Sequence, residues 1–220
     1  MTIKYFSGGW FVPEYEAHLQ DWMTRVNKRR DGRLLYQSRK YETALTFCKS
    51  RRFAVDIGAH VGLWSWQMAK DFAKVVAFEP IPIHRECYAR NMQGVNNVTL
   101  YAVALGDETK DAFIKTRTPN SSGDTGIEAD GIPVQMRRLD EFELVSVDFI
   151  KVDCEGFEVF VMKGATDTLK RCKPCVIVEQ KPETGMAKRY GIGVTDAVKF
   201  LESLGAKTRA AIQGDYIMTW

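Results

Sequence analysis

From Phe53 onward, short apolar runs alternate with amphipathic stretches, and this alternation limits the chain to few architectures. It is the pattern of βαβ units, in which a helix crosses over between parallel strands of one sheet. Strands are predicted at residues 53–57, 75–79, 98–103, 147–153 and 175–180. Helices are predicted between them, at residues 63–73, 84–94, 158–172 and 194–205. We therefore expect an α/β domain with helices on both faces of a mostly parallel sheet.

The C-terminal residues 206–220 do not continue this alternation. They read as two strands about a Gln213-Gly214-Asp215 turn, which is a hairpin rather than another crossover. Added to the five strands above, the hairpin makes a sheet of seven strands. Residues 116–133 are polar, rich in Gly and Ser, and too long for an ordinary connection, so we expect a mobile loop near the site.

The first 52 residues carry many aromatic and basic residues and no glycine-rich motif. Helical spacing predicts one helix over residues 14–30, broken at Asp31 and Gly32, and a second over residues 42–50. We expect residues 1–52 to form a helical cover that contacts substrate, and residues 53–220 to form the main domain.

Composition places the chain in the globular class. Of its 220 residues 45% are hydrophobic and 27% are charged, and the net charge of +3 is too small to mark an obligate nucleic-acid binder. No run is long enough to span a bilayer, and the N-terminus lacks the apolar core of a signal peptide, so the cytoplasm is the expected compartment. Five scattered cysteines are expected to be free thiols.

The segment FAVDIGAHVG predicts a cofactor site. A buried strand ends in Asp56, glycines at 58 and 62 allow a tight turn, and a helix follows with its N–H groups facing the same space. His60 stands where a dinucleotide fingerprint has its second glycine, which disfavours a pyrophosphate. The carboxylate of Asp56 suits the ammonium or sulfonium of S-adenosylmethionine better.

The segment VVAFEP supplies the second half of that site. Glu79 ends the next predicted strand, at the distance along the chain where an acidic residue accepts both ribose hydroxyls of an adenosine cofactor. The alternative is a surface glutamate after an ordinary turn. Two elements in register with the βαβ pattern favour the cofactor.

Several motifs together resemble the FkbM family of S-adenosylmethionine-dependent methyltransferases. They are FAVDIGAHVG, AFEP, VALGD, NSSG, RRLDEF and, most specific, VDFIKVDCEGFEVFVMKGA, and they cover most of residues 41–180. The resemblance implies a Rossmann-like class I methyltransferase fold and O-methylation of hydroxyls on sugars, glycolipids or polyketide-type metabolites. The first forty residues match nothing in the family, and the family often has Asn at the position of His60 and an aliphatic residue at that of Cys154.

Carried over residue by residue, the resemblance implies contacts between the cofactor and the glycine loop, the ribose carboxylate and an adenine wall. These residues are Asp56, Gly58, Ala59, His60, Gly62, Glu79 with Pro80, Ala104, Leu105 and Asp153.

Asp153 and Glu155 follow the fourth predicted strand, at the edge of the sheet where ligands of open α/β folds bind. Methyl transfer to a hydroxyl needs positioning and a base, and either carboxylate could serve, with His60 and Glu179 as further candidates. The structural alternative is that Asp153 holds the cofactor's amino group and Glu155 caps the following helix.

Other polar groups are assigned structural roles. Asp153, Glu155, Glu158 and Glu179 could together bind a divalent ion, but the favoured prediction is no metal. Cys172 and Cys175 have CxxC spacing without a second pair, so packing is favoured over zinc or redox chemistry. His18 and His84 are likewise expected to be structural.

Three functions stay open. The leading one is an enzyme that methylates a hydroxyl of a small molecule or glycan. The second is a nucleic-acid methyltransferase that uses NKRRDGR with Arg51, Arg52, Arg137 and Arg138, although DCEG replaces the motif that holds a flipped base. The third is a non-catalytic adenosine-binding module. The oligomeric state is not predicted.

Overall fold

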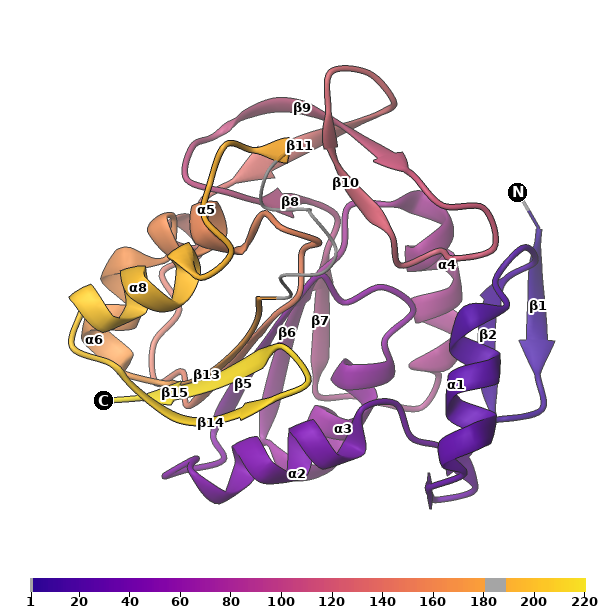
Figure 1. The fold of residues 1–220 in the computed structure, drawn as a ribbon. Helices are drawn as coiled ribbons and strands as arrows, with labels where there is room; N and C mark the ends of the chain where they lie inside the picture. Colours follow the sequence, from indigo (N-terminus) through magenta and orange to yellow (C-terminus); the bar gives the residue numbers. More distant parts are fainter. Residues whose placement is uncertain (1, 181–188) are drawn as a thin grey trace.

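A seven-stranded sheet forms the centre of the computed structural model, which describes residues 2–180 and 189–220 (Figure 1). The strand order is β14-β15-β13-β12-β5-β6-β7, and β15 runs antiparallel to both its neighbours. The strands are β5 (Phe53–Ile57), β6 (Lys74–Phe78), β7 (Val98–Tyr101), β12 (Phe149–Val152), β13 (Cys175–Glu179), β14 (Lys207–Ile212) and β15 (Asp215–Thr219). The mostly parallel sheet and its C-terminal hairpin are confirmed.

Helices cover both faces of this sheet. On one face Ala54 and Val75 pack with α2 (Ser38–Thr46) and α3 (Leu63–Asp71). On the other face Val55 and Val76 share a core with α5 (Glu158–Lys163), α6 (Thr166–Cys172) and α8 (Asp196–Ser203). Neighbouring residues of one strand point to opposite faces, so these strands, covered on both sides, are mostly apolar, with polar exceptions such as Asp56 and Lys151.

The polar stretch from Thr116 to Pro133 is more ordered than the sequence indicated. It contains β10 (Thr125–Glu128), which pairs with β9 (Lys110–Thr116), and its end begins β11 (Ile132–Arg137). With β8 (Ala104–Leu105) these strands form a second, four-stranded sheet. The prediction of one long loop was wrong because Ile127 and Ile132, both opposite Ile114, are the few apolar positions that fix the pairing.

The N-terminal segment contains strands as well as helices. A hairpin of β1 (Ile3–Phe6) and β2 (Trp10–Pro13) precedes α1 (His18–Val26), and β3 (Arg29–Arg30) pairs with β4 (Arg33–Leu34). β2 lies against α4 (Pro82–Asn91), which places the segment beside the main sheet (Figure 1). The predicted helices were misplaced: α1 is shorter than residues 14–30 and α2 starts before residue 42.

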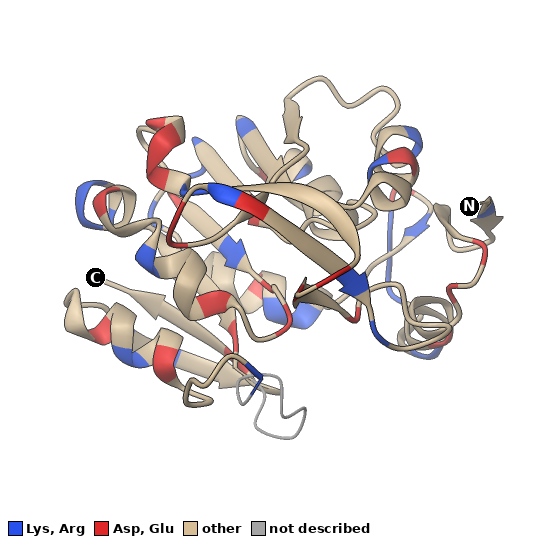
Figure 2. Cartoon of the chain, turned by 90° about the horizontal axis from the view of Figure 1, so that it is seen from above, with Lys and Arg blue, Asp and Glu red and all other residues tan. Residues whose placement is uncertain are grey.

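Two further expectations concern the whole chain. No helix among the described residues is both long enough and apolar enough to cross a bilayer. All five cysteines are free thiols, as predicted. Basic and acidic residues are interspersed in the view of Figure 2.

The predicted helix over residues 158–172 is divided into α5 and α6 at Gly164, which lies against the segment that follows β8. A Cβ atom on Gly164 would overlap the carbonyl oxygen of Gly106, which follows β8. The carbonyl oxygen of Gly164 also accepts a hydrogen bond, at 3.0 Å, from the amide of Asp140. Asp140 lies in the short 3-10 helix Leu139–Phe142. Glycine is needed here for close approach of two backbones.

We expect Gly164→Ala to lower the free energy of unfolding by about 1–3 kcal/mol, the usual cost of overpacking a rigid site. Gly123→Ala is the matched control, because a Cβ atom there meets nothing within 4 Å. Urea unfolding of both variants tests this, and equal stability of the two would contradict the close approach of Gly164 to Gly106.

Candidate active site

A cleft opens at the carboxyl ends of β5, β6 and β12. Nine of the eleven site residues expected from the sequence line it: Gly58, Ala59, His60, Glu79, Pro80, Ala104, Leu105, Asp153 and Glu155. The structure thus brings together residues that are up to 97 positions apart in the chain, counted from 58 to 155. Asp56 and Gly62, the other two, are not among the lining residues.

The glycine loop makes two close contacts that require glycine. Gly58 has a φ of +73°, and a Cβ atom there would overlap the carbonyl oxygen of Asp153. Gly62, with a φ of +92°, faces Tyr88 and Met92 of the α4 region, where a Cβ atom would come within 2.7 Å of the Met92 methyl. His60 lies between them with a φ of +52°, a conformation that is strained for a residue with a side chain.

Asp56 supports the loop from beneath instead of facing the cleft. Its carboxylate is fully buried, accepts a hydrogen bond from Ser65 at 2.6 Å and lies 3.5 Å from the ammonium of Lys151. Burial raises the pKa of Asp56, while Lys151 and Ser65 act in the opposite direction. The Lys151 ammonium also donates to the carbonyl oxygen of Gly58 at 2.8 Å, so this ion pair fixes the loop.

Glu79 lies in the floor of the cleft. Its Oε2 atom accepts a hydrogen bond from the amide of His60 at 2.8 Å, and Oε1 accepts from the amide of Ile81 at 2.8 Å. The Nδ1 atom of His84 lies 3.2 Å from Oε1. Burial alone would raise the pKa of Glu79, but His84 and the two amides outweigh it, so the pKa is lowered and the side chain is an anion.

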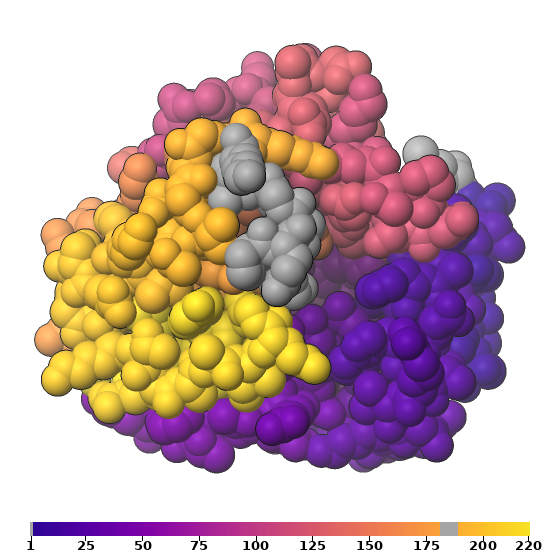
Figure 3. Space-filling model, in the orientation of Figure 1, coloured from indigo at the N-terminus to yellow at the C-terminus, as the bar shows by residue number. Residues whose placement is uncertain are grey.

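A second network, which no sequence pattern indicates, joins the loop to the N-terminal segment. The buried Glu16 carboxylate accepts hydrogen bonds from the amide (2.6 Å) and the hydroxyl of Ser122. The same hydroxyl lies 2.7 Å from Nε2 of His60. Because the single hydroxyl proton goes to Glu16, His60 donates through Nε2. Figure 3 shows the polar stretch lying against the N-terminal segment.

The environment of His60 disfavours its charged form. Burial holds the pKa of His60 well below its usual value. An imidazole with a lowered pKa has a low affinity for a proton, and the Nε2 atom of His60 is already bonded to Ser122, so His60 is a weak candidate for the base considered above.

Three carboxylates meet at the other end of the cleft. Asp153, Glu155 and Glu179 each offer an oxygen within 4.8 Å of the others, and Asp153 lies 3.9 Å from the Lys151 ammonium. Tyr36 lines the same cleft, and burial together with these carboxylates holds the pKa of its phenol well above the usual value. Such a group could accept protons or hold a cation, although acidic clusters without an ion are common.

Glu158 belongs to the same motif but stabilises its backbone. Its Oε1 atom accepts hydrogen bonds from the amides of Cys154 at 2.9 Å and Gly156 at 3.0 Å, and the side chain is buried. Burial raises the pKa of Glu158 to about 7. The carboxylate that binds the turn before α5 is therefore Glu158, whereas the structural alternative considered from the sequence assigned that role to Glu155.

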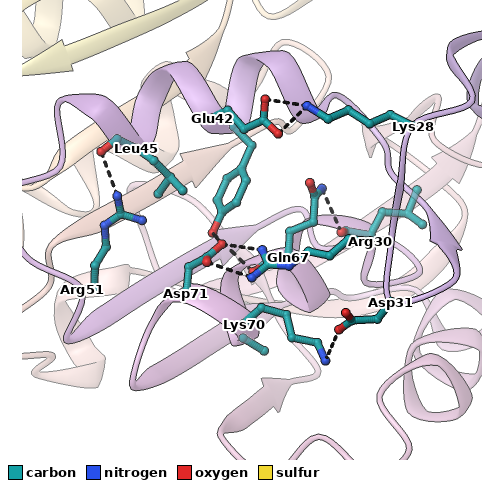
Figure 4. A network of polar contacts seen from close by, with 12 residues as sticks. Lys28, Arg30, Asp31, Glu42, Leu45, Arg51, Gln67, Lys70 and Asp71 are labelled. Atoms are coloured by element: carbon teal, nitrogen blue, oxygen red, sulfur yellow. Dashed lines mark hydrogen bonds and ion pairs between the residues drawn. The ribbon is translucent and has the colours of Figure 1, made fainter.

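The basic residues considered for nucleic-acid binding have partners within the protein, several of which Figure 4 shows. The contacts are Arg30 to Asp71 (2.8 Å), Arg51 to the Leu45 carbonyl (3.0 Å), Arg52 to Asp148 (2.6 Å) and Arg137 to Glu141 (2.9 Å). Lys28 beside them pairs with Glu42. Each of these cations is thus already engaged.

The sequence of this chain matches the family model of the methyltransferase FkbM domain over residues 56–207. These residues span the glycine loop, the strand that ends before Glu79 and the acidic end of the cleft. The chain belongs to this family. Methyltransferase 1 of Beauveria bassiana is 26% identical over 147 residues, 52% of this chain and 59% of that protein. Methyltransferase sdnD of Sordaria araneosa is 25% identical over 179 residues, 62% of this chain and 69% of that protein.

Solved structures confirm the class I methyltransferase fold expected from the sequence. Methyltransferase FkbM from Methylobacillus flagellatus superimposes with a TM-score of 0.52 at 18% identity, covering 76% of this chain and 43% of that one. A precorrin-6y C5,15-methyltransferase from Geobacter metallireducens has a TM-score of 0.51 at 15% identity, covering 81% and 86%. This chain therefore covers less than half of the Methylobacillus structure and less than two thirds of the Beauveria protein.

The raised pKa of Glu158 predicts a pH effect on stability. The folded protein holds this proton more tightly than the unfolded chain, so its stabilising contribution is complete below about pH 4.5 and is lost as the pH rises toward 7. Glu158→Gln keeps an oxygen for both amides and cannot titrate. We expect the variant to gain stability relative to the wild type between pH 5 and 8, by at most about 1.4 kcal/mol per pH unit.

Urea unfolding of both proteins across that range measures the difference, in which other titrating groups cancel. Parallel curves for the two proteins would show that Glu158 titrates normally.

Proposed function

We propose that this chain is an S-adenosylmethionine-dependent methyltransferase that transfers a methyl group to a hydroxyl of a sugar, glycolipid or other small metabolite. The observation that carries the proposal is the buried Glu79 anion, fixed by the amide of His60 in the glycine loop. Membership in the FkbM family supports the reaction, and the O-methylation rests on the resemblance of the motifs.

The residues of the cleft fit this cofactor. Glu79 is ionised and therefore accepts hydrogen bonds without donating them. Its Oε2 atom accepts from the amide of His60, and a carboxylate oxygen can accept a second hydrogen bond, so it can also accept from a ribose hydroxyl. Phe78, Ala104 and Leu105 line the cleft with apolar side chains, against which an adenine ring can pack. Asp153 at the acidic end suits the positive charge of the amino group and sulfonium.

The bound cofactor supplies a methyl group on a positively charged sulfur, and the protein positions the acceptor and removes its proton. A sugar or alcohol hydroxyl is too weakly acidic to ionise alone, so a carboxylate near it serves as the base. Glu155 lines the cleft, whereas Asp153 lies 3.9 Å from the ammonium of Lys151 at the glycine loop. We assign Glu155 as the first candidate base and Asp153 mainly to the cofactor.

Removal of the Glu79 charge tests the cofactor assignment. We expect Glu79→Gln to weaken binding of S-adenosylhomocysteine about 10- to 100-fold, the value of a hydrogen bond to a charged group. Glu86→Gln is the matched control, since Glu86 is exposed on α4 and pairs with Arg90 one turn away. Calorimetric titration measures both affinities, with thermal unfolding as a check on folding.

NAD is titrated beside S-adenosylhomocysteine. Binding of NAD without S-adenosylhomocysteine would contradict the proposal and make the loop a dinucleotide site. If neither ligand binds, a non-catalytic module is favoured.

The base is tested with an acceptor found by transfer of labelled methyl groups to panels of monosaccharides, glycolipids and hydroxylated polyketides. We expect Glu155→Gln to lower kcat about 100-fold or more while the affinity for S-adenosylhomocysteine stays unchanged. In contrast to Glu155→Gln, Asp153→Asn is expected to weaken the binding of S-adenosylhomocysteine. Equal kcat for wild type and Glu155→Gln would remove Glu155 from catalysis, and labelling of nucleic acid alone would overturn the acceptor class.

A further inference from the structure

His84 is a buried histidine in the first turn of α4, five residues after Glu79, and it lines the cleft. Only 1% of its surface is exposed. The sequence offered no reason to give it a role beyond structure. Its two ring nitrogens, however, have very different surroundings.

The Nδ1 atom has a fixed role. It lies 3.2 Å from Oε1 of Glu79, and an ionised carboxylate can only accept. Nδ1 therefore carries a proton and donates it to Glu79. In the neutral imidazole the other nitrogen, Nε2, is then an acceptor with a free lone pair.

The Nε2 atom has no hydrogen-bond partner among the described residues, although it is buried. A buried acceptor without a partner is destabilising, and native proteins rarely retain one without a reason. The ring of His60 contacts His84 edge-on, with centroids 4.3 Å apart, but its own Nε2 is directed to Ser122. The missing donor is thus best supplied from the cleft that His84 lines.

We propose that His84 is a cofactor-binding residue whose Nε2 atom accepts a hydrogen bond from one hydroxyl of the ribose, while Glu79 accepts from the other. This inference rests on the proposed cofactor. The two acceptors, His84 Nε2 and a Glu79 carboxylate oxygen, belong to side chains that are hydrogen-bonded to each other. Two neighbouring acceptors match the two neighbouring hydroxyl donors of a vicinal diol. The pair discriminates a ribonucleoside cofactor from a deoxynucleoside, since a ligand lacking one hydroxyl would leave one acceptor unpaired.

The test variant is His84→Asn. Asparagine can place an amide N–H where Nδ1 donates to Glu79, but it has no atom at the position of Nε2. His18→Asn is the matched control, because His18 is an exposed residue at the start of α1 and outside the cleft. Thermal unfolding of the unliganded variants verifies that both fold.

Three ligands are titrated by calorimetry at about pH 8, where imidazole groups are ordinarily neutral. They are S-adenosylhomocysteine and its 2′-deoxy and 3′-deoxyribose analogues. We expect His84→Asn to bind S-adenosylhomocysteine about three- to tenfold more weakly than the wild type. One deoxy analogue, the one lacking the hydroxyl that His84 accepts, should bind variant and wild type within about twofold of each other.

The possible failures are distinguishable. If the wild type binds S-adenosylhomocysteine and His84→Asn binds it equally well, the inference is wrong and the proposed function stands. An equal loss for all three ligands would assign His84 to packing alone. A wild type that does not bind S-adenosylhomocysteine overturns the proposed function and this inference with it.

Discussion

The architecture of the cleft depends on one buried cation, Lys151 in the central strand β12. Burial disfavours its charge, but the carboxylates of Asp56 and Asp153 outweigh burial and raise its pKa. Its ammonium bonds the Gly58 carbonyl oxygen and lies within 4 Å of both carboxylates. The ends of two neighbouring strands are therefore bonded together, and loss of this charge would leave buried carboxylates without a counter-ion.

The main sheet and much of the cleft could be predicted because their signals are local. Five apolar strands, the hairpin and the order of glycine and acidic residues are all contained in short windows of sequence. Parallel strands then bring their carboxyl ends together, so residues as distant as Gly58 and Glu155 line the same cleft. The periodic pattern decides both the fold and the place of the site.

The parts that were missed depend on contacts between distant segments. Lys151 looks like one polar residue in an apolar strand, and only the neighbouring strand shows that it faces Asp56. Glu16 and Ser122 are 106 residues apart, and no local pattern relates them. The β1–β2 hairpin was missed because its aromatic residues fit a helix-rich cover equally well, whereas packing of Trp10 against Trp66 decides the matter.

The carboxyl groups in and around the cleft are chemically alike, but their surroundings give them different pKa values and different roles. Glu79 has its pKa lowered by His84 and two amides, whereas Glu158 has its pKa raised by burial to about 7. Burial also raises the pKa of Asp56, but this carboxylate faces the ammonium of Lys151 beneath the loop. In the proposed function Glu79 is the anion that binds the cofactor, whereas Glu158 stabilises a turn and Asp56 is the counter-ion of Lys151 beneath the loop. Glu155 lines the cleft, where the proposed O-methylation would need its base.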